Sequence, residues 1–134
     1  MNLAIRELGG MTAELEAKFK HQRIRKSDQL LNAARTPAAR HALAKATGVD
    51  ESAILELANR ADLARVKGIG QVLADLLTQA GVDSLRELAN CRPDNLQRKL
   101  IEVNTHKRVA WRAPDRRSVE DWIAQAKQLP KLLE

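Results

Sequence analysis

The chain has 134 residues, of which 44% are hydrophobic and 30% charged, and this balance excludes an intrinsically disordered protein. Its 23 Lys and Arg residues outnumber its 17 Asp and Glu residues, so the formal net charge of +6 favours polyanionic partners. The single cysteine, Cys91, excludes an internal disulfide and any metal site built from several thiolates, and no apolar run reaches the length of a membrane span.

The first half of the sequence carries helix signals and no stretch that alternates as a half-buried strand does. Thr36 followed by Pro37 is typical of an N-cap and the first position of a helix. Asp50 can cap a helix over Glu51–Asn59, and a short helix is expected to follow over Ala61–Val66.

The second half carries the same kind of signals. A helix is expected to start near Gln71, and Gly81 suits the left-handed position after its end. Pro93 can open a helix that runs to about Val103, and Pro130 ends the last one. Two pairs have the capping-box spacing, in which a Ser and an acidic residue three positions later close the first turn: Ser84 with Glu87, and Ser118 with Asp121.

The two halves resemble each other when the sequence is shifted by 58 positions, so that Gly10 meets Gly68. The matched apolar pairs are Ile5 with Leu63, Leu8 with Val66, Met11 with Ile69, Leu15 with Leu73, Phe19 with Leu77, Ile24 with Val82 and Leu30 with Leu88. A unit of two helices and a tight turn cannot bury its apolar face alone. We therefore expect stacked units in an all-α fold, with one pair in residues 1–60 and a second pair, followed by a C-terminal helix, in residues 61–134.

The stretch VKGIGQVLADLL, Val66–Leu77, places two glycines around one apolar residue. Gly68 and Gly70 permit backbone conformations that a Cβ atom would penalise, and Ile69 is expected to point into the core. Such a turn exposes successive backbone N–H groups at a helix start, where the helix dipole also attracts anions. A nucleic-acid phosphate is the expected guest, and contacts of this kind carry no base information.

VKGIGQVLADLL resembles the helix-hairpin-helix motif, which occurs in many proteins of DNA repair, recombination and replication and binds the phosphate backbone there. Nearly the whole chain resembles a bacterial family catalogued as domain of unknown function 4332. The segments that carry this resemblance are TPAARHALAKATGVDESAILELANRADLARVKGIG, NLQRKLIEVN and SVEDWIAQAKQLP. The resemblance implies tandem helix-hairpin-helix units packed into one compact helical domain, with DNA as the expected partner.

On the positions that match the motif, Gly68–Gly70 would form the hairpin, and Gln71 and Val72 would donate N–H groups to a phosphate. Arg65 and Lys67 supply the positive charge nearby. The alternative interpretation is structural, since Gly-x-Gly can simply let two helices cross closely.

The first copy, LGGMTAELEAKF, departs from the motif because Thr12 stands where the second glycine is expected. Thr12 can cap the following helix instead. Glu14 and Glu16 would then lie in the first turn, where they stabilise the helix and repel a phosphate. We therefore expect the hairpin Gly10-Met11-Thr12 to be structural.

Two basic clusters are further candidates for binding. In KFKHQRIRK, Lys18–Lys26, we expect Phe19 and Ile24 to turn inward and the charges to face solvent. HKRVAWRAPDRR, His106–Arg117, is the expected connector between two late helices. Trp111 in this connector could stack on an unpaired base or pin the connector onto the core, and the charges could simply be solvated. The candidate nucleic-acid-binding residues around it are Lys107, Arg108 and Arg112.

No residues with catalytic or metal-ligand spacing stand out. His21, His41 and His106 are far apart, and no nucleophile–base–acid set or phosphate-binding loop is visible. We expect no enzyme activity, no metal, no cofactor, no small-molecule substrate and no membrane association. The N-terminus lacks a signal-peptide core, which favours the cytoplasm. The leading hypothesis is a protein that binds DNA, or RNA, through backbone phosphates, and the alternative is a protein-interaction or scaffold module.

Overall fold

The computed structural model describes residues 2–134, and the described part confirms the all-α fold class. It contains no strand apart from one isolated antiparallel bridge between Ala4 and Lys26. The elements follow in the order η1 (a 3₁₀ turn, Ile5–Glu7), α1 (Ala13–His21), α2 (Ser27–Ala33), α3 (Pro37–Thr47), α4 (Glu51–Leu63), α5 (Gln71–Gln79), α6 (Leu85–Ala89), α7 (Pro93–Lys107) and α8 (Arg116–Gln128).

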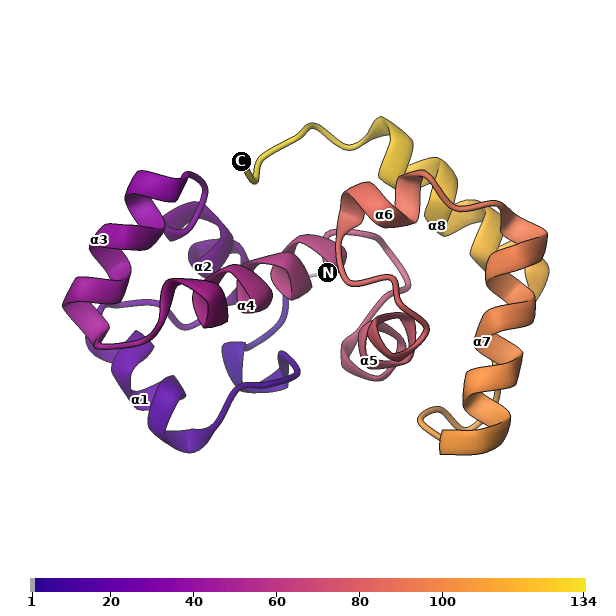
Figure 1. Cartoon of the computed structure of the whole chain (residues 1–134), viewed down its shortest axis with the longest axis horizontal. Helices are drawn as coiled ribbons and strands as arrows, with labels where there is room; N and C mark the ends of the chain where they lie inside the picture. Colours follow the sequence, from indigo (N-terminus) through magenta and orange to yellow (C-terminus); the bar gives the residue numbers. More distant parts are fainter. Residues whose placement is uncertain (1) are drawn as a thin grey trace.

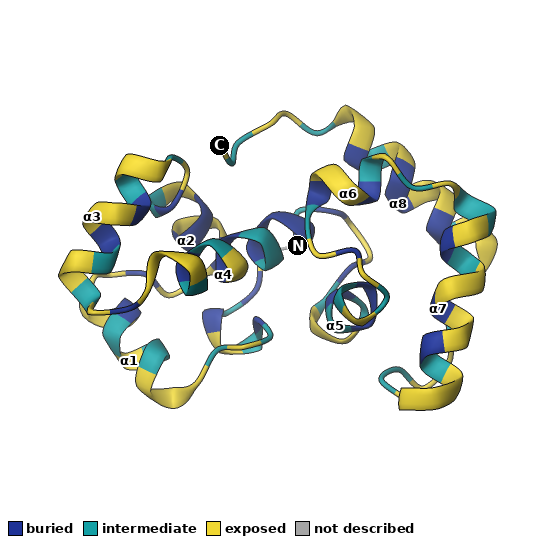
Figure 2. Cartoon of the chain, in the orientation of Figure 1, coloured by how far each residue is buried: buried dark blue, intermediate teal, exposed yellow. Residues whose placement is uncertain are grey.

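The helices form two groups that follow the sequence. Figure 1 shows α1 to α3 on one side of the molecule and α5 to α8 on the other, with α4 running towards the middle. Helix α4 packs on α2 and α3, and α8 packs on α6 and α7. The buried residues coloured in Figure 2 form two apolar clusters, one from Leu3 to Ala64 and one from Leu63 to Ala126. The chain therefore passes from one core to the other at the end of α4.

Helix α4 is continuous over Glu51–Leu63, so the expected break between Asn59 and Ala61 is wrong. Leu57, Ala58 and Ala61 are buried together on one face, at the spacing of an uninterrupted helix. The start of the second unit expected at residue 61 consequently falls inside the last turn of this helix.

The 58-residue repeat is visible in the backbone. Helices α1 and α5 have equal lengths and matching positions, and the glycines before them have similar positive φ angles, 89° at Gly10 and 100° at Gly68. Each of the two helices ends with a left-handed residue, Arg23 with φ 63° and Gly81 with φ 92°. The residue after each one donates its N–H to a carbonyl five residues earlier, at 2.9 Å in both copies. Both ends are Schellman motifs, as expected for Gly81.

Local capping explains where several helices begin. Thr36 Oγ1 accepts a hydrogen bond from Ala39 N at 3.1 Å, and Ser84 Oγ accepts one from Glu87 N at 3.1 Å, so both of these expected caps are confirmed. The expected cap at Ser118 is wrong. Asp115 Oδ1 accepts a hydrogen bond from Ser118 N at 2.8 Å, so that Asp115 is the cap and α8 begins at Arg116.

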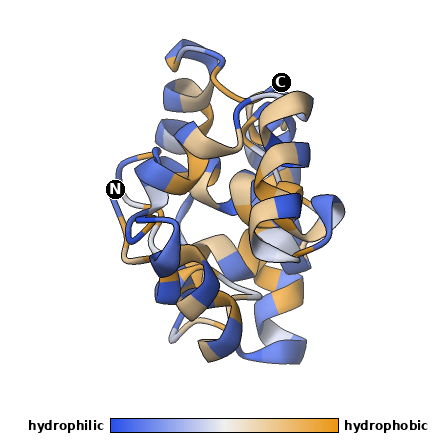
Figure 3. Ribbon diagram, turned by 90° about the vertical axis from the view of Figure 1, so that its left-hand side faces the viewer, coloured by the Kyte–Doolittle hydropathy of each residue, from blue (hydrophilic) through white to orange (hydrophobic). Residues whose placement is uncertain are grey.

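The C-terminal segment, residues 130–134, returns from α8 to the first group of helices (Figure 1). Leu132 and Leu133 pack against the first apolar cluster, and the Glu134 N–H donates to the Arg35 carbonyl at 2.7 Å. The side view in Figure 3 shows hydrophobic and hydrophilic residues alternating around most helices, as amphipathic helices require. Among residues 2–134, no helix combines the length and apolarity needed to cross a membrane.

Candidate nucleic-acid interface

The turn between α4 and α5 buries its apolar residues, whereas Gly68 is exposed and Gly70 is half-buried. Val66 and Ile69 are fully buried, and the Ile69 N–H donates to the Val66 carbonyl at 3.2 Å, which closes the turn. Gly68 and Lys67 are exposed. Ile69 is therefore a core residue, as expected from its position between two glycines, and it shapes the turn without offering a surface to a ligand.

Helix α8 packs against this turn and supports it. Gln125 Oε1 accepts a hydrogen bond from Lys67 N at 2.8 Å, and Gln125 Nε2 donates to the Lys67 carbonyl at 3.0 Å. A Cβ atom at Gly68 would lie 2.9 Å from Nε1 of the buried Trp122. The main chain of Lys67 is thus occupied by the protein itself, so only its side chain is available to a partner.

The start of α5 is open. Its N-cap is Gly70, which has no side chain to close the first turn, and no acidic residue lies in that turn. The N–H groups of Gln71 and Val72 donate no hydrogen bond to any residue that the structure describes, and both residues are exposed. Unbonded N–H groups and the positive end of the helix dipole coincide here, which is the arrangement that binds oxyanions.

Asp75 lies only one turn further along α5, but its charge is not free to repel an anion. Arg60 Nη1 donates to Asp75 Oδ1 at 2.8 Å, and the two side chains are 21% and 32% exposed. The ion pair joins α4 to α5 and offsets the charge of the Asp75 carboxylate.

The first hairpin has the same backbone and is closed by side chains. The Met11 N–H donates to the Leu8 carbonyl at 3.1 Å, as the corresponding Ile69 N–H does to Val66. Thr12 Oγ1 accepts the Leu15 N–H at 3.1 Å, so a first-turn donor is satisfied internally. Glu14 and Glu16 occupy the first turn of α1. A phosphate would meet two carboxylates at this helix start.

Of the two cations expected beside the second hairpin, one is free and one is paired. Arg65 Nη1 lies 2.9 Å from Asp62 Oδ1, and both side chains are largely buried. Burial raises the pKa of the Asp62 carboxyl above its ordinary value, although the hydrogen bond from Arg65 opposes this shift. Lys67 makes no ion pair with the residues described. The usable charge at the hairpin is therefore mainly that of Lys67.

A groove of about 430 Å³ adjoins the hairpin, and its lining includes one basic residue, Arg35, that the sequence analysis did not single out. Arg35, Arg65 and Lys67 line it together with one acid, Asp28. Arg35 reaches this place because the C-terminal segment and α2 meet there, which no local sequence pattern indicates.

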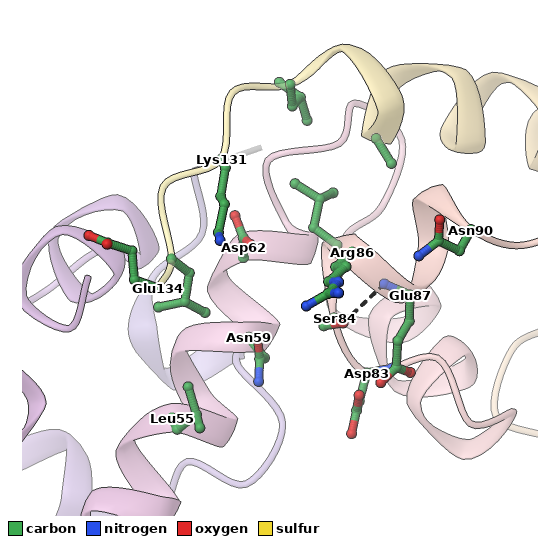
Figure 4. Close-up of a pocket in the computed structure, with 14 residues that line it drawn as sticks. Leu55, Asn59, Asp62, Asp83, Ser84, Arg86, Glu87, Asn90, Lys131 and Glu134 are labelled. Atoms are coloured by element: carbon green, nitrogen blue, oxygen red, sulfur yellow. Dashed lines mark hydrogen bonds between the residues drawn. The ribbon is translucent and has the colours of Figure 1, made fainter. Parts of the chain in front are cut away.

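A second groove, about 800 Å³, lies between α4, α6 and the C-terminal segment (Figure 4). Its charged lining consists of Asp62, Asp83, Glu87 and Glu134 against Arg86 and Lys131. Four acids against two bases make this groove unsuitable for a phosphate chain.

The connector between α7 and α8 forms a separate basic group. Lys107 ends α7, and Arg108 follows with φ 51° as its left-handed cap. Arg112 is exposed, as are Lys107 and Arg108. Trp111 is fully exposed, with a relative accessibility of 101%, so the expectation that it pins the connector onto the core is wrong. Trp122 of α8, with 4% exposure, is the tryptophan that packs into the core.

The two basic clusters do not form one compact patch. Figure 1 places α1, with the Lys18–Lys26 cluster at its end, and the C-terminal end of α7 towards opposite ends of the long axis. Phe19 and Ile24 are buried, as expected. Lys18 and Lys20 pair with Glu14 and Glu16 at 3.6 and 3.4 Å, which weakens the first cluster as a phosphate site.

Comparison with known proteins places the chain in one family. The family model described as domain of unknown function (DUF4332) matches residues 9–129. No curated protein and no solved structure matches the chain. The matched range includes both hairpins, the connector and the eight α-helices that residues 2–134 form. The chain therefore belongs to the family of the domain of unknown function DUF4332.

Proposed function

We propose that this protein binds nucleic acid through backbone phosphates, independently of base sequence, with the turn Gly68–Gly70 and the start of α5 acting as a helix-hairpin-helix phosphate site. The observation that carries the proposal is the open start of α5, where the N–H groups of Gln71 and Val72 are exposed and unbonded among the residues described.

The chemistry suits a phosphate oxygen. Two adjacent N–H donors at a helix N-terminus can both point at one oxyanion, and the dipole adds a favourable potential. Lys67, one residue before the glycine turn, can approach the same phosphate or its neighbour. None of these groups reads a base edge, so affinity without sequence preference follows.

The connector residues Lys107, Arg108 and Arg112 supply the second set of contacts in this proposal. A backbone contact at the hairpin and several cations on the connector would release counterions on binding, so affinity falls steeply with salt. DNA is the first choice of partner because the hairpin resembles one that occurs in DNA-binding proteins. RNA presents the same phosphates. The proposal contains no enzymatic step, and a cytoplasmic location stays a prediction.

The test is a titration of a fluorescein-labelled 20-base-pair duplex, followed by anisotropy from low to moderate salt, with a second duplex of different sequence. We expect equal affinities for both sequences, and replacing Lys67 by Gln should reduce the slope of log K against log salt by about 1. Lys45→Gln is the matched control, since Lys45 is exposed at the end of α3 in the other half and should leave the slope unchanged. Absence of binding at the lowest salt would overturn the proposal.

A protein-interaction module is the second candidate function. Gln125 already occupies the main chain of Lys67, as a purely structural hairpin would require, and Val72 beside the hairpin is an exposed apolar side chain (49%). Capture of the same protein partner from nuclease-treated and untreated extracts, and its loss on Val72→Asp, would favour this function over the first.

A further inference from the structure

The two tryptophans of this chain have opposite environments. Trp122 is buried in the second core, whereas the indole of Trp111 is entirely exposed. A fully exposed indole is unfavourable in water unless a partner covers it, because it is among the largest apolar groups in proteins. No structural role of Trp111 in the described fold accounts for the exposure of its ring.

The connector that carries Trp111 is anchored on both sides. The Arg108 N–H donates to the Asn104 carbonyl at 2.9 Å, and the Ala110 N–H donates to Asn104 Oδ1 at 2.8 Å. Val109 and Ala110 pack against the second core cluster. On the far side, Asp115 caps α8. Trp111 therefore lies in a turn that is anchored on both sides, and this turn exposes the indole ring to solvent.

The surroundings of the ring are cationic. Lys107, Arg108 and Arg112 are exposed within four residues of Trp111, and no acid occurs between Lys107 and Pro114. The nearest acid along the chain, Asp115, caps α8. Glu102 and Glu120 follow at equal separation, and Glu120 accepts a hydrogen bond from Arg116 Nε at 2.8 Å. An aromatic face between cations matches alternating bases and phosphates of an unpaired strand.

We propose that Trp111 stacks on an unpaired base of single-stranded nucleic acid, while Lys107, Arg108 and Arg112 contact the flanking phosphates. This inference rests on the proposed function, since it assumes a nucleic-acid partner, and it adds the preferred form of that partner. Bases in a duplex already stack on each other, so Trp111 contributes to binding only where bases are unpaired, as in a single strand, an overhang or a bubble.

The test compares a dT12 oligonucleotide, which has no base pairing of its own, with a blunt 12-base-pair duplex at low salt. On Trp111→Ala we expect the affinity for dT12 to fall roughly 5- to 150-fold, the effect of losing one stacked base, and the duplex affinity to change less than twofold. Trp111→Phe should keep most of the affinity for dT12. In the wild type, dT12 should quench the emission of the exposed indole.

The fluorescence of Trp122 supplies the control for folding. It is the only tryptophan left in Trp111→Ala, and because it is buried its emission should stay blue-shifted and unaffected by dT12. Equal affinity of Trp111→Ala and wild type for dT12 would overturn the inference and leave phosphate binding intact. Failure of both proteins to bind any nucleic acid would overturn the proposed function itself. Trp111-dependent binding to polyglutamate as strong as to dT12 would also overturn the stacking inference, in favour of an acidic protein partner.

Discussion

The two hairpins of this protein share one backbone and differ in what closes the following helix. Gly10 and Gly68 have nearly the same positive φ, and α1 and α5 start at matching positions. At the first hairpin, Thr12 caps the helix and two glutamates occupy its first turn, whereas at the second hairpin Gly70 leaves the turn open. A turn that folds equally well with either ending can be specialised by its N-cap and first-turn residues, without any change in the fold.

The hairpins also differ in how the neighbouring elements support them. Gln125 of α8 holds the main chain of Lys67. The corresponding residue of the first hairpin is Gly9, where a Cβ atom would lie 1.8 Å from Arg60 Nη1 of the Arg60–Asp75 ion pair. Each hairpin thus packs against a different partner, and neither support covers the first turn of α5.

The largest stability difference between the hairpins should come from alanine at the two positive-φ glycines. Gly68→Ala combines backbone strain of about 1–2 kcal/mol with overpacking against Trp122 of about 1–3 kcal/mol. Gly10→Ala should cost only the strain, about 1–2 kcal/mol, because the nearest atom to its Cβ is Leu57 Cδ2 at 3.9 Å. Urea unfolding followed by circular dichroism measures both. A larger loss at Gly10 than at Gly68 would contradict the packing described for α8.

The clamp on Lys67 should have an intermediate effect. Gln125→Ala removes two hydrogen bonds to the Lys67 main chain, and we expect unfolding free energy to fall by about 1–2 kcal/mol. Gln128→Ala is the matched control on the same helix, because Gln128 is exposed and should change stability by less than about 0.5 kcal/mol. Equal effects of the two substitutions would mean that the clamp does not hold the hairpin.

The smallest effects should come from the two left-handed helix ends, and they should have opposite signs. Arg23→Gly relieves the strain of a side chain at φ 63° and should stabilise the protein by about 0.5–1 kcal/mol. Gly81→Ala introduces that strain at φ 92°, with no steric contact within 4 Å, and should destabilise by about 1 kcal/mol. Thermal unfolding of the two variants under identical conditions tests the pair. The same sign for both would show that the two ends are not equivalent.

The features that sequence reasoning predicted are local ones. The turn glycines, the inward position of Ile69 and the cap at Thr36 each depend on residues within one turn of each other, and the repeat is a recurrence of such a local pattern after 58 residues. The predicted break in α4 is wrong because the packing of Ala58 and Ala61 continues the helix through Asn59 and Arg60.

The features that sequence reasoning missed depend on contacts between distant segments. Gln125 lies 58 residues from Lys67 along the chain, so no motif links them. The two tryptophans differ in burial, because Trp122 lies on the apolar face of α8 and Trp111 lies outside the described helices. One missed feature is local instead: the pairing of Arg65 with Asp62 has i, i+3 spacing, and this signal was available in the sequence.

The most direct test of the account places an acid at the first position of each helix. Gln71→Glu and Ala13→Glu both put a carboxylate at a helix N-terminus, which favours the helix, so neither should lower the free energy of unfolding. We predict that Gln71→Glu weakens binding of a labelled duplex at low salt about fivefold or more, whereas Ala13→Glu leaves it within twofold. Equal affinities for the two variants, or a loss confined to Ala13→Glu, would contradict the claim that phosphate binds at the open start of α5.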